Sequence, residues 1–270
     1  MVNLLNQKRY KATFISAIVT AVIAHGFALI NVLHNYDNIS VFMRGYGTGL
    51  SSERWLLTLL GDWIKNTGGG YNAPLFNGIL TILLLSITAC IIIEFFEINS
   101  MILCSLIGAI FLCFPTVTST MFFMYTAPYY ALAILLAVLA AWFADGQRFG
   151  MVYGSILCAF SLGIYQAYLP LTASLLILKM LQNSLSKQRK IEKFLKEGFC
   201  FFFTLVFGVL IYWILLKVCL ITKGVSLSDY QGIDQMGKLI ITEIPYLIKS
   251  AIIRLLALYF RTTVEFPRHQ

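Results

Sequence analysis

The sequence predicts an all-α integral membrane protein, a polytopic bundle of about seven or eight transmembrane helices with an amphipathic helix at one interface. Hydrophobic residues make up 59% of the 270-residue chain and charged residues only 12%. The mean hydropathy is +0.81, so the chain has too little polar surface to cover a water-soluble globule. The apolar residues form runs close to the roughly 20 residues that a helix needs to cross a bilayer.

The first run, 12–33, follows the basic segment 8–11, and basic residues before a first span place the N-terminus in the cytoplasm. The polar interval 34–71 is then expected on the outer side. Within it, apolar residues recur at helical spacing over 53–64, a segment too short to span the bilayer. We expect this segment to lie along the outer interface as an amphipathic helix.

Later runs continue the alternation of spans and short connections. Tight connections are expected at 94–99 and 115–120, and the basic run 187–193 is expected in the cytoplasm. The stretch 150–181 is too long for one straight crossing, and Tyr165, Gln166 and Pro170 interrupt it, which predicts two short helices meeting near the outer face. The expected spans after the first cover 72–95, 99–114, 121–143, the two halves of 150–181, 199–221 and 244–260.

Charge and cysteine usage exclude several function classes. The net charge of +8 resides in short connections, which favours topology signals and contacts with anionic lipid headgroups over binding of nucleic acid. The six cysteines are scattered singly in apolar runs without a C-x-x-C pair, which argues against disulfides and zinc. We expect no metal site, no cofactor and no soluble domain, and a single integral membrane domain over 1–270.

Asp37 lies a few residues beyond the first span, where a carboxylate near the outer surface could act as a general base toward a lipid-borne substrate. The alternative is an ordinary turn aspartate. Nearby, Glu53, Arg54 and Trp55 offer a carboxylate, a guanidinium that can hold phosphate bidentately, and an aromatic face for a sugar ring. The alternative is an interface helix with a snorkelling arginine and an aromatic-belt tryptophan.

Further candidate substrate-binding residues lie in or beside apolar runs. Tyr125 and Tyr129 accompany Pro128, which is expected to kink the fourth span, and they either line a carbohydrate groove or belong to the aromatic belt. Gln166, which follows Tyr165, lies at membrane depth and needs hydrogen-bond partners, either on a substrate or on another helix. Lys249 and Arg254 either bind a lipid phosphate or anchor the chain to lipid headgroups. These candidates are Tyr125, Tyr129, Tyr165, Gln166, Lys249 and Arg254.

Several short motifs follow one another in a fixed order, and together they resemble the bacterial membrane glucosyltransferase family of the GtrII type. The resemblance covers about residues 1–198. The motifs are His34-Asn35-Tyr36-Asp37-Asn38, Ser52-Glu53-Arg54-Trp55, Asn72-Ala73-Pro74-Leu75, Tyr125-Thr126-Ala127-Pro128-Tyr129 and Ser161-Leu162-Gly163-Ile164-Tyr165-Gln166-Ala167-Tyr168.

The resemblance implies a GT-C-like enzyme of the bacterial cytoplasmic membrane. Such an enzyme takes glucose from a polyprenyl-phosphate carrier and attaches it, on the outer side, to a cell-envelope polysaccharide such as O-antigen. Asp37 fits the acidic residue of the first outer loop, which would accept the proton of the acceptor hydroxyl. Arg54, and next Arg254, would stabilise the departing lipid phosphate. The residues that would orient sugar and acceptor are Tyr125, Tyr129, Tyr165 and Gln166.

Two alternatives stay open at this point. Members of that family are usually longer, so residues 199–270 are expected to hold further spans of a truncated copy, and a non-catalytic remnant is one alternative. The other is a lipid-sugar transporter or flippase. A transporter of the inverted-repeat type would carry broken helices at corresponding positions of two halves, and the sequence shows no such symmetry.

Overall fold

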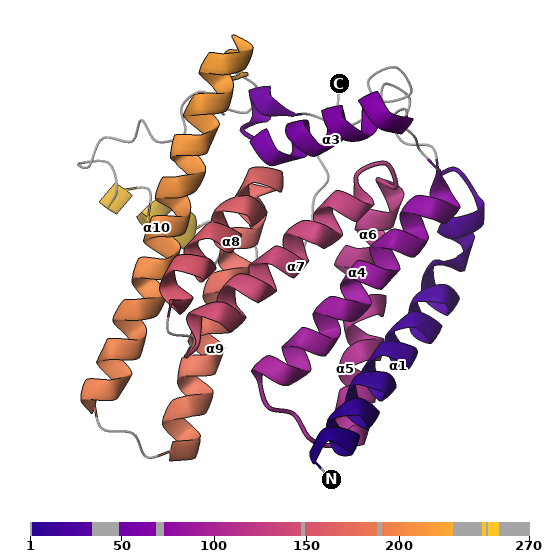
Figure 1. Ribbon diagram of the computed structural model, residues 1–270, viewed down its shortest axis with the longest axis vertical. Helices are drawn as coiled ribbons and strands as arrows, with labels where there is room; N and C mark the ends of the chain where they lie inside the picture. The colour runs from indigo at the N-terminus through magenta and orange to yellow at the C-terminus, as the bar shows by residue number, and fades with distance from the viewer. Residues whose placement is uncertain are drawn as a thin grey trace. The chain divides into compact units, whose positions relative to one another are not determined.

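A computed structural model describes residues 2–33, 49–68, 73–146, 149–187, 191–228, 245–246 and 248–253. Throughout these residues the regular secondary structure is helical (Figure 1), so the all-α prediction is confirmed. The chain divides into two compact units, Met1–Ser226 and Leu227–Gln270. The described helical residues of the second unit are 245–246 and 248–253.

Five helices in the described part of the chain are long and apolar enough to cross a membrane. They expose many large apolar side chains on their outer faces, as lipid-facing helices do. A sixth apolar helix, Gly150–Ile164, is shorter. The five segments are Gln7–Ile30, Pro74–Phe95, Met101–Phe122, Ala127–Ala144 and Ile191–Lys223.

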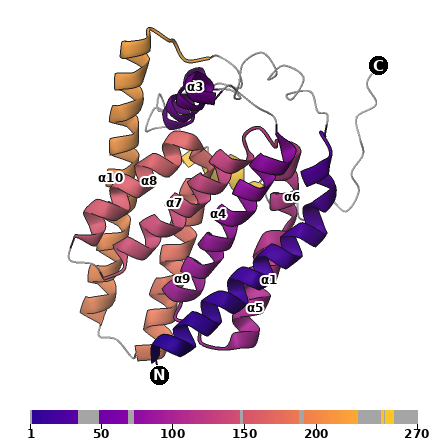
Figure 2. The ribbon, with the colours of Figure 1, turned by 45° about the vertical axis from the view of Figure 1, so that its right-hand side comes forward.

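Helix α1 (Val2–Ile30) lies along α5 (Met101–Cys113) and α4 (Pro74–Phe95), as Figures 1 and 2 both show. The backbones of α1 and α5 approach closely at Gly108, where a Cβ would lie 2.4 Å from the Thr13 carbonyl oxygen. Small residues at such a contact let membrane helices pack without a large hydrophobic driving force.

Two sequence predictions about prolines are wrong. The expected connection at 115–120 is helical: α6 (Pro115–Phe122) follows α5 after a break at Phe114, and the turn comes at 123–126. Pro128 does not kink a span but lies in the first turn of α7 (Ala127–Ala144). In both cases the proline stands where a helix has no backbone acceptor for its N–H, so the missing donor costs nothing.

The predicted break in the stretch 150–181 is confirmed. Helix α8 (Gly150–Ile164) ends at Tyr165, whose backbone is extended, and a short 3₁₀ turn η2 (Gln166–Tyr168) leads into α9 (Leu169–Lys187). Helix α10 (Ile191–Lys223) has 33 residues, more than the expected 199–221. The additional residues at its start include part of the basic run 187–193, which we expected to be a connection. Residues 188–190 of that run lie outside the described residues.

Helix α3 (Trp55–Gly68), which follows the 3₁₀ turn η1 (Leu50–Ser52), lies across one end of the other helices (Figure 1). The predicted amphipathic helix at 53–64 therefore forms, and it begins at Trp55. It packs against α8 and α10, and an ion pair between Asp62 and Lys223 joins it to the end of α10. We call this end of the bundle the α3 end.

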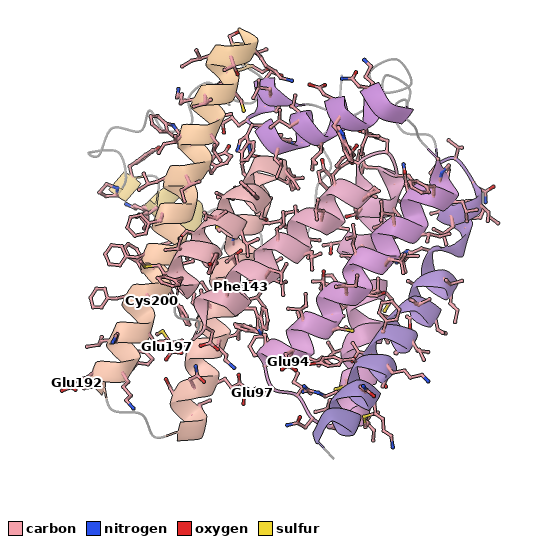
Figure 3. All side chains as sticks on the ribbon, in the orientation of Figure 1. Glu94, Glu97, Phe143, Glu192, Glu197 and Cys200 are labelled. Carbon is pink, nitrogen blue, oxygen red and sulfur yellow. The ribbon has the colours of Figure 1, made fainter. Side chains whose placement is uncertain are left out.

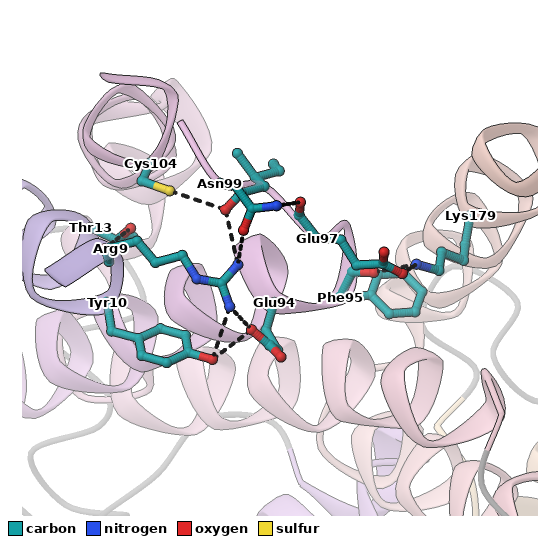
Figure 4. A network of polar contacts seen from close by, with 10 residues as sticks. Arg9, Tyr10, Thr13, Glu94, Phe95, Glu97, Asn99, Cys104 and Lys179 are labelled. Carbon is teal, nitrogen blue, oxygen red and sulfur yellow. Dashed lines mark hydrogen bonds and ion pairs between the residues drawn. The ribbon is translucent and has the colours of Figure 1, made fainter. Parts of the chain in front are cut away.

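The opposite end, where α1 begins, holds a network of charged side chains (Figures 3 and 4). Buried Arg9 forms an ion pair with Glu94, and its guanidinium donates to the Ile98 carbonyl at 3.0 Å. Lys179 from α9 reaches the same region and contacts Glu97 at 3.2 Å. These bonds tie α1 and α9 to the connection between α4 and α5.

Candidate functional site

Polar and aromatic side chains from four separate segments meet at the α3 end of the bundle. The segments are η1 with the start of α3, the first turn of α7, the break between α8 and α9, and α10. The chain reverses at this end, because α8 ends and α9 begins there. The members of this group, which we call the α3-end cluster, are Glu53, Arg54, Tyr130, Tyr165, Gln166 and Tyr212.

Arg54 is held by two tyrosines. Its Nη1 donates a hydrogen bond to the Tyr130 hydroxyl at 3.2 Å, and its guanidinium carbon lies 4.7 Å from the centroid of the Tyr165 ring. The two rings stack with centroids 5.0 Å apart. A guanidinium over an aromatic face keeps its charge while its planar donors stay oriented. Arg54 is half-buried, and the two tyrosines fix where its guanidinium lies.

Glu53 is buried and has a left-handed backbone, with φ 64° and ψ 15°. A residue other than glycine adopts this conformation at a cost, which marks the position as one held by its surroundings. The Tyr212 hydroxyl lies 3.1 Å from the Glu53 carbonyl oxygen and 3.5 Å from its Oε2. A side chain of α10 therefore fixes the residue that precedes Arg54.

Gln166 connects the helix break to the same point. Its Nε2 donates to the Ser52 carbonyl oxygen and to the Tyr212 hydroxyl, both at 3.1 Å. One amide thus joins η1, the α8–α9 break and α10. The glutamine that interrupts an apolar stretch has the interhelical partners that a polar group at such a position requires.

The electrostatics of Glu53 differ from those of an exposed carboxylate. Burial raises the pKa of Glu53 above its ordinary value of 4.5, while the hydrogen bond from Tyr212 and the charge of Lys217 oppose that rise. A carboxyl group with a raised pKa next to a hydroxyl and near a cation suits proton exchange or a hydrogen bond to a sugar hydroxyl.

Trp55 packs behind the cluster. Its side chain is buried, and its ring meets Phe160 edge-on at 5.8 Å. A Cβ at Gly163 would lie 2.5 Å from Cε2 of the indole, so this glycine is required for the ring to fit. The tryptophan thereby fixes the start of α3 against α8.

Comparison with known proteins gives one result. The family model described as Glucosyl transferase GtrII matches residues 26–265. The chain belongs to the GtrII glucosyl transferase family. The resemblance predicted from the motifs is confirmed, and the match reaches well beyond residue 198, to include all of α10. No significant match was found among curated proteins or among solved structures.

In this GtrII-family chain the structure brings together four of the predicted site residues, namely Glu53, Arg54, Tyr165 and Gln166. Tyr129 is buried beside them against Leu57 and Ile164. Tyr125 is buried just before the start of α7. Lys249 is exposed and belongs to the second unit. Asp37 and Arg254 lie outside the described residues.

Three tyrosines of this site were not among the predicted residues. Tyr130 and Tyr168 are the aromatic neighbours of Tyr165, with the Tyr168 ring 5.5 Å from it. Tyr212 is the bridge between Glu53 and Gln166. Tyr130 adjoins a quoted motif, so it had a sequence signal, whereas Tyr212 is one aromatic residue among many in α10 and had none.

The described residues include no group of three or more histidine, cysteine, aspartate or glutamate side chains that could hold a metal ion. The α3-end cluster itself offers a carboxylate, a guanidinium, phenols and an amide. These groups can bind an anion, orient a sugar and move a proton.

Proposed function

We propose that this GtrII-family protein transfers a glucosyl residue from a polyprenyl-phosphate carrier to a cell-envelope polysaccharide such as O-antigen. In this proposal it is a GT-C-like enzyme of the bacterial cytoplasmic membrane. It spans the membrane about seven or eight times, the number that the apolar runs of its sequence predict. Its N-terminus is cytoplasmic because basic residues lie near the start of α1, before the apolar run of that helix. The α3 end then faces outward, and α3 lies along the outer interface.

The single observation that carries the proposal is the position of Arg54. Two stacked tyrosines hold its guanidinium where a bundle of apolar helices ends. A lipid-linked phosphate needs this combination, because its chain remains in the hydrocarbon while its charge requires a cation at the boundary. Membership of the GtrII glucosyl transferase family supplies the reaction type.

The proposed reaction is a displacement at the anomeric carbon of the glucosyl residue. The acceptor hydroxyl oxygen forms a bond to that carbon, and its proton goes to the carboxylate of Asp37. The bond between the anomeric carbon and the phosphate oxygen breaks, and the polyprenyl phosphate leaves with the electron pair. Arg54 stabilises the charge that develops on the phosphate. Arg254 and Lys249 stay proposed as cations that bind a lipid phosphate.

The remaining predicted residues bind and orient the substrates in this proposal. Glu53 and Gln166 offer a carboxylate and an amide to sugar hydroxyls, as both already contact a hydroxyl group, that of Tyr212. Tyr165 and the buried rings of Trp55, Tyr125 and Tyr129 shape the walls of the site.

The test uses purified full-length protein in detergent, supplied with polyprenyl-phosphate glucose carrying a labelled sugar and with the polysaccharide acceptor. Transfer of label is expected from the native protein and is expected to fall at least about 100-fold in Asp37→Asn, the range for loss of a general base. The matched control is Glu192→Gln, an exposed carboxylate of α10, which should transfer normally.

Detergent removes the two compartments that a transporter needs. A folded native protein that transfers no label would therefore contradict the enzyme and favour a flippase or a non-catalytic remnant. Full transfer by Asp37→Asn would contradict the role of Asp37 alone, and Glu53 would then be the carboxylate to test.

A further inference from the structure

A second feature lies at the opposite end of the bundle from α3, on the surface that α1 and α5 form together. It is an open groove of about 530 Å³. Six of its lining residues come from α1 and two from α5, the two helices that pack most extensively against each other. The lining residues are Lys8, Lys11, Ala12, Ile15, Ser16, Val19, Met101 and Ser105.

The groove changes character along its length. Lys8 and Lys11 stand at the end where α1 begins, and the side chains that follow are small or apolar, with Ile15 48% and Val19 51% exposed. Ser16 does not add a free polar group, because its hydroxyl donates to the Ser105 carbonyl oxygen at 2.7 Å. The groove therefore has a cationic end and an apolar remainder.

The two lysines are the cations that the protein leaves available at this point. The neighbouring Arg9 is buried; it forms an ion pair with Glu94 and donates a hydrogen bond to the carbonyl of Ile98. Lys8 and Lys11 are exposed and take part in no ion pair with any residue that the structure describes. An anion at the groove would thus meet two positive charges without competition from a described carboxylate.

The dimensions match one leaflet of a bilayer. From Lys8 to Val19, α1 rises by roughly 16 Å, which is about half of the ~30 Å hydrocarbon thickness of a membrane. A soluble phosphate ion would make no favourable contact with the apolar part of the groove. A neutral lipid would leave the two lysines without a counter-charge. A molecule with a charged phosphate and a hydrocarbon chain uses both.

From this arrangement we infer that the α1–α5 groove is a binding site for an anionic phospholipid of the surrounding membrane. Its phosphate is held by Lys8 and Lys11, and one acyl chain lies along Ile15, Val19 and Met101. The lipid covers the contact between α1 and α5, and it lies at the end of the bundle opposite the α3-end cluster. The inference does not depend on the glucosyl transfer proposed above.

The experiment measures retention of phosphatidylglycerol and phosphatidylcholine by the full-length protein, using native mass spectrometry of the protein in mild detergent. The native protein is expected to retain one phosphatidylglycerol preferentially. The double variant K8Q/K11Q is expected to lose about tenfold or more in affinity for it, since each lysine near a membrane surface strengthens anion binding several-fold, with little change for phosphatidylcholine.

The matched control is K193Q/K196Q. These two exposed lysines have the same i, i+3 spacing, and α10 begins at the same end of the bundle as α1 (Figure 1). The control removes the same charge, and neither residue lines the groove. An equal loss in both double variants, or no loss in K8Q/K11Q, would overturn the site, because the lysines would then act only through net charge or not at all.

A second variant tests the apolar part while keeping both lysines. Ala12→Trp fills the groove from a half-buried position, and it is expected to reduce phosphatidylglycerol retention with unchanged thermal unfolding. Full retention would mean that the lipid is not in the groove. In a last arm a polyprenyl phosphate is added at equal concentration. Preferential displacement of phosphatidylglycerol from the native protein would show the groove to be a carrier site and would overturn the assignment to membrane phospholipid.

Discussion

The two ends of the helix bundle both contain half-buried or buried cations, but the partners of these cations differ. At the end where α1 begins, Lys179 lies 2.6 Å from the Phe95 carbonyl oxygen, 3.2 Å from Glu97 and 3.6 Å from Asp145. At the α3 end, Arg54 contacts a phenol hydroxyl and the face of a tyrosine ring. One cation is enclosed by oxygen atoms, and the other is oriented by aromatic groups.

This difference separates a structural role from a role in binding. A buried cation that contacts carboxylates and a carbonyl has a structural role, because removing one member of the group leaves the charges of the others uncompensated. Aromatic rings orient a guanidinium so that its planar donors keep the geometry that suits a bidentate phosphate. The proposed phosphate site lies at the α3 end, so substitutions at the two ends should separate activity from stability.

The largest effect is expected from Arg54→Lys. An ammonium group cannot reproduce the planar, bidentate donors of a guanidinium over the Tyr165 ring. Glucosyl transfer should fall by about 100-fold or more, the scale seen when one group that stabilises transition-state charge is removed. Initial rates with labelled polyprenyl-phosphate glucose give the activity, and thermal unfolding in detergent should change little.

The counterpart of this substitution at the other end is Arg9→Lys. It weakens the bonds with Glu94 and with the Ile98 carbonyl, so it should lower thermal stability while the folded fraction retains its transfer rate. The comparison between the ends fails if Arg9→Lys reduces the rate as strongly as Arg54→Lys does.

An effect on stability alone is expected from Lys179→Met. The side chain of Lys179 is only 4% exposed. Methionine is of similar length but removes the ammonium group that contacts Asp145 and the Phe95 carbonyl. Loss of one partner from a buried ion pair costs about 3–5 kcal/mol. Because Glu97 is 68% exposed and Asp145 26% exposed, we expect the lower end of that range. Chemical denaturation followed by circular dichroism measures it.

The matched control for Lys179→Met is Lys193→Met, which removes an exposed lysine of α10 and should change the free energy of unfolding by less than about 0.5 kcal/mol. If both substitutions have equal effects, the network at this end stabilises nothing beyond a surface charge.

Much of the order of helices and connections could be predicted, because it depends on apolar runs and on the polar residues that interrupt them, and both are local features of the sequence. The break at Tyr165 and Gln166 interrupts an apolar stretch with polar groups, and the prediction there is confirmed. Pro115 and Pro128 misled the prediction because a proline signals either the end or the start of a helix, and the hydrogen-bonding context that decides between them is not visible in composition.

The cluster could be predicted only in part, because its contacts join distant segments. Arg54 and Glu53 carried chemistry that can be read from residue type, but the hydrogen bond between Glu53 and Tyr212 spans 159 positions. Tyr212 resembles the other aromatic residues of α10 until packing brings it to η1. Residue type therefore predicts the reactive groups, and tertiary packing determines which of them work together.

The smallest expected effect, that of Glu53→Gln on the pH dependence of stability, sharpens the comparison most. Burial raises the pKa of Glu53 above 4.5, so the folded protein binds this proton more tightly than the unfolded chain does. As pH rises from the unfolded pKa through the folded one, the free energy of unfolding must fall. Glutamine has no such proton, so Glu53→Gln should lack that fall and be at least as stable as the native protein at pH 7.

Thermal unfolding from pH 4 to pH 8 measures the difference, and Glu192→Gln serves as the control for loss of one exposed carboxylate. A drop in stability at pH 7 for Glu53→Gln would place Glu53 with Glu94 among the structural carboxylates. The expected result, unchanged or higher stability together with slower transfer, would mean that the α3 end keeps a buried carboxylate at the expense of stability, as binding sites do and structural networks do not.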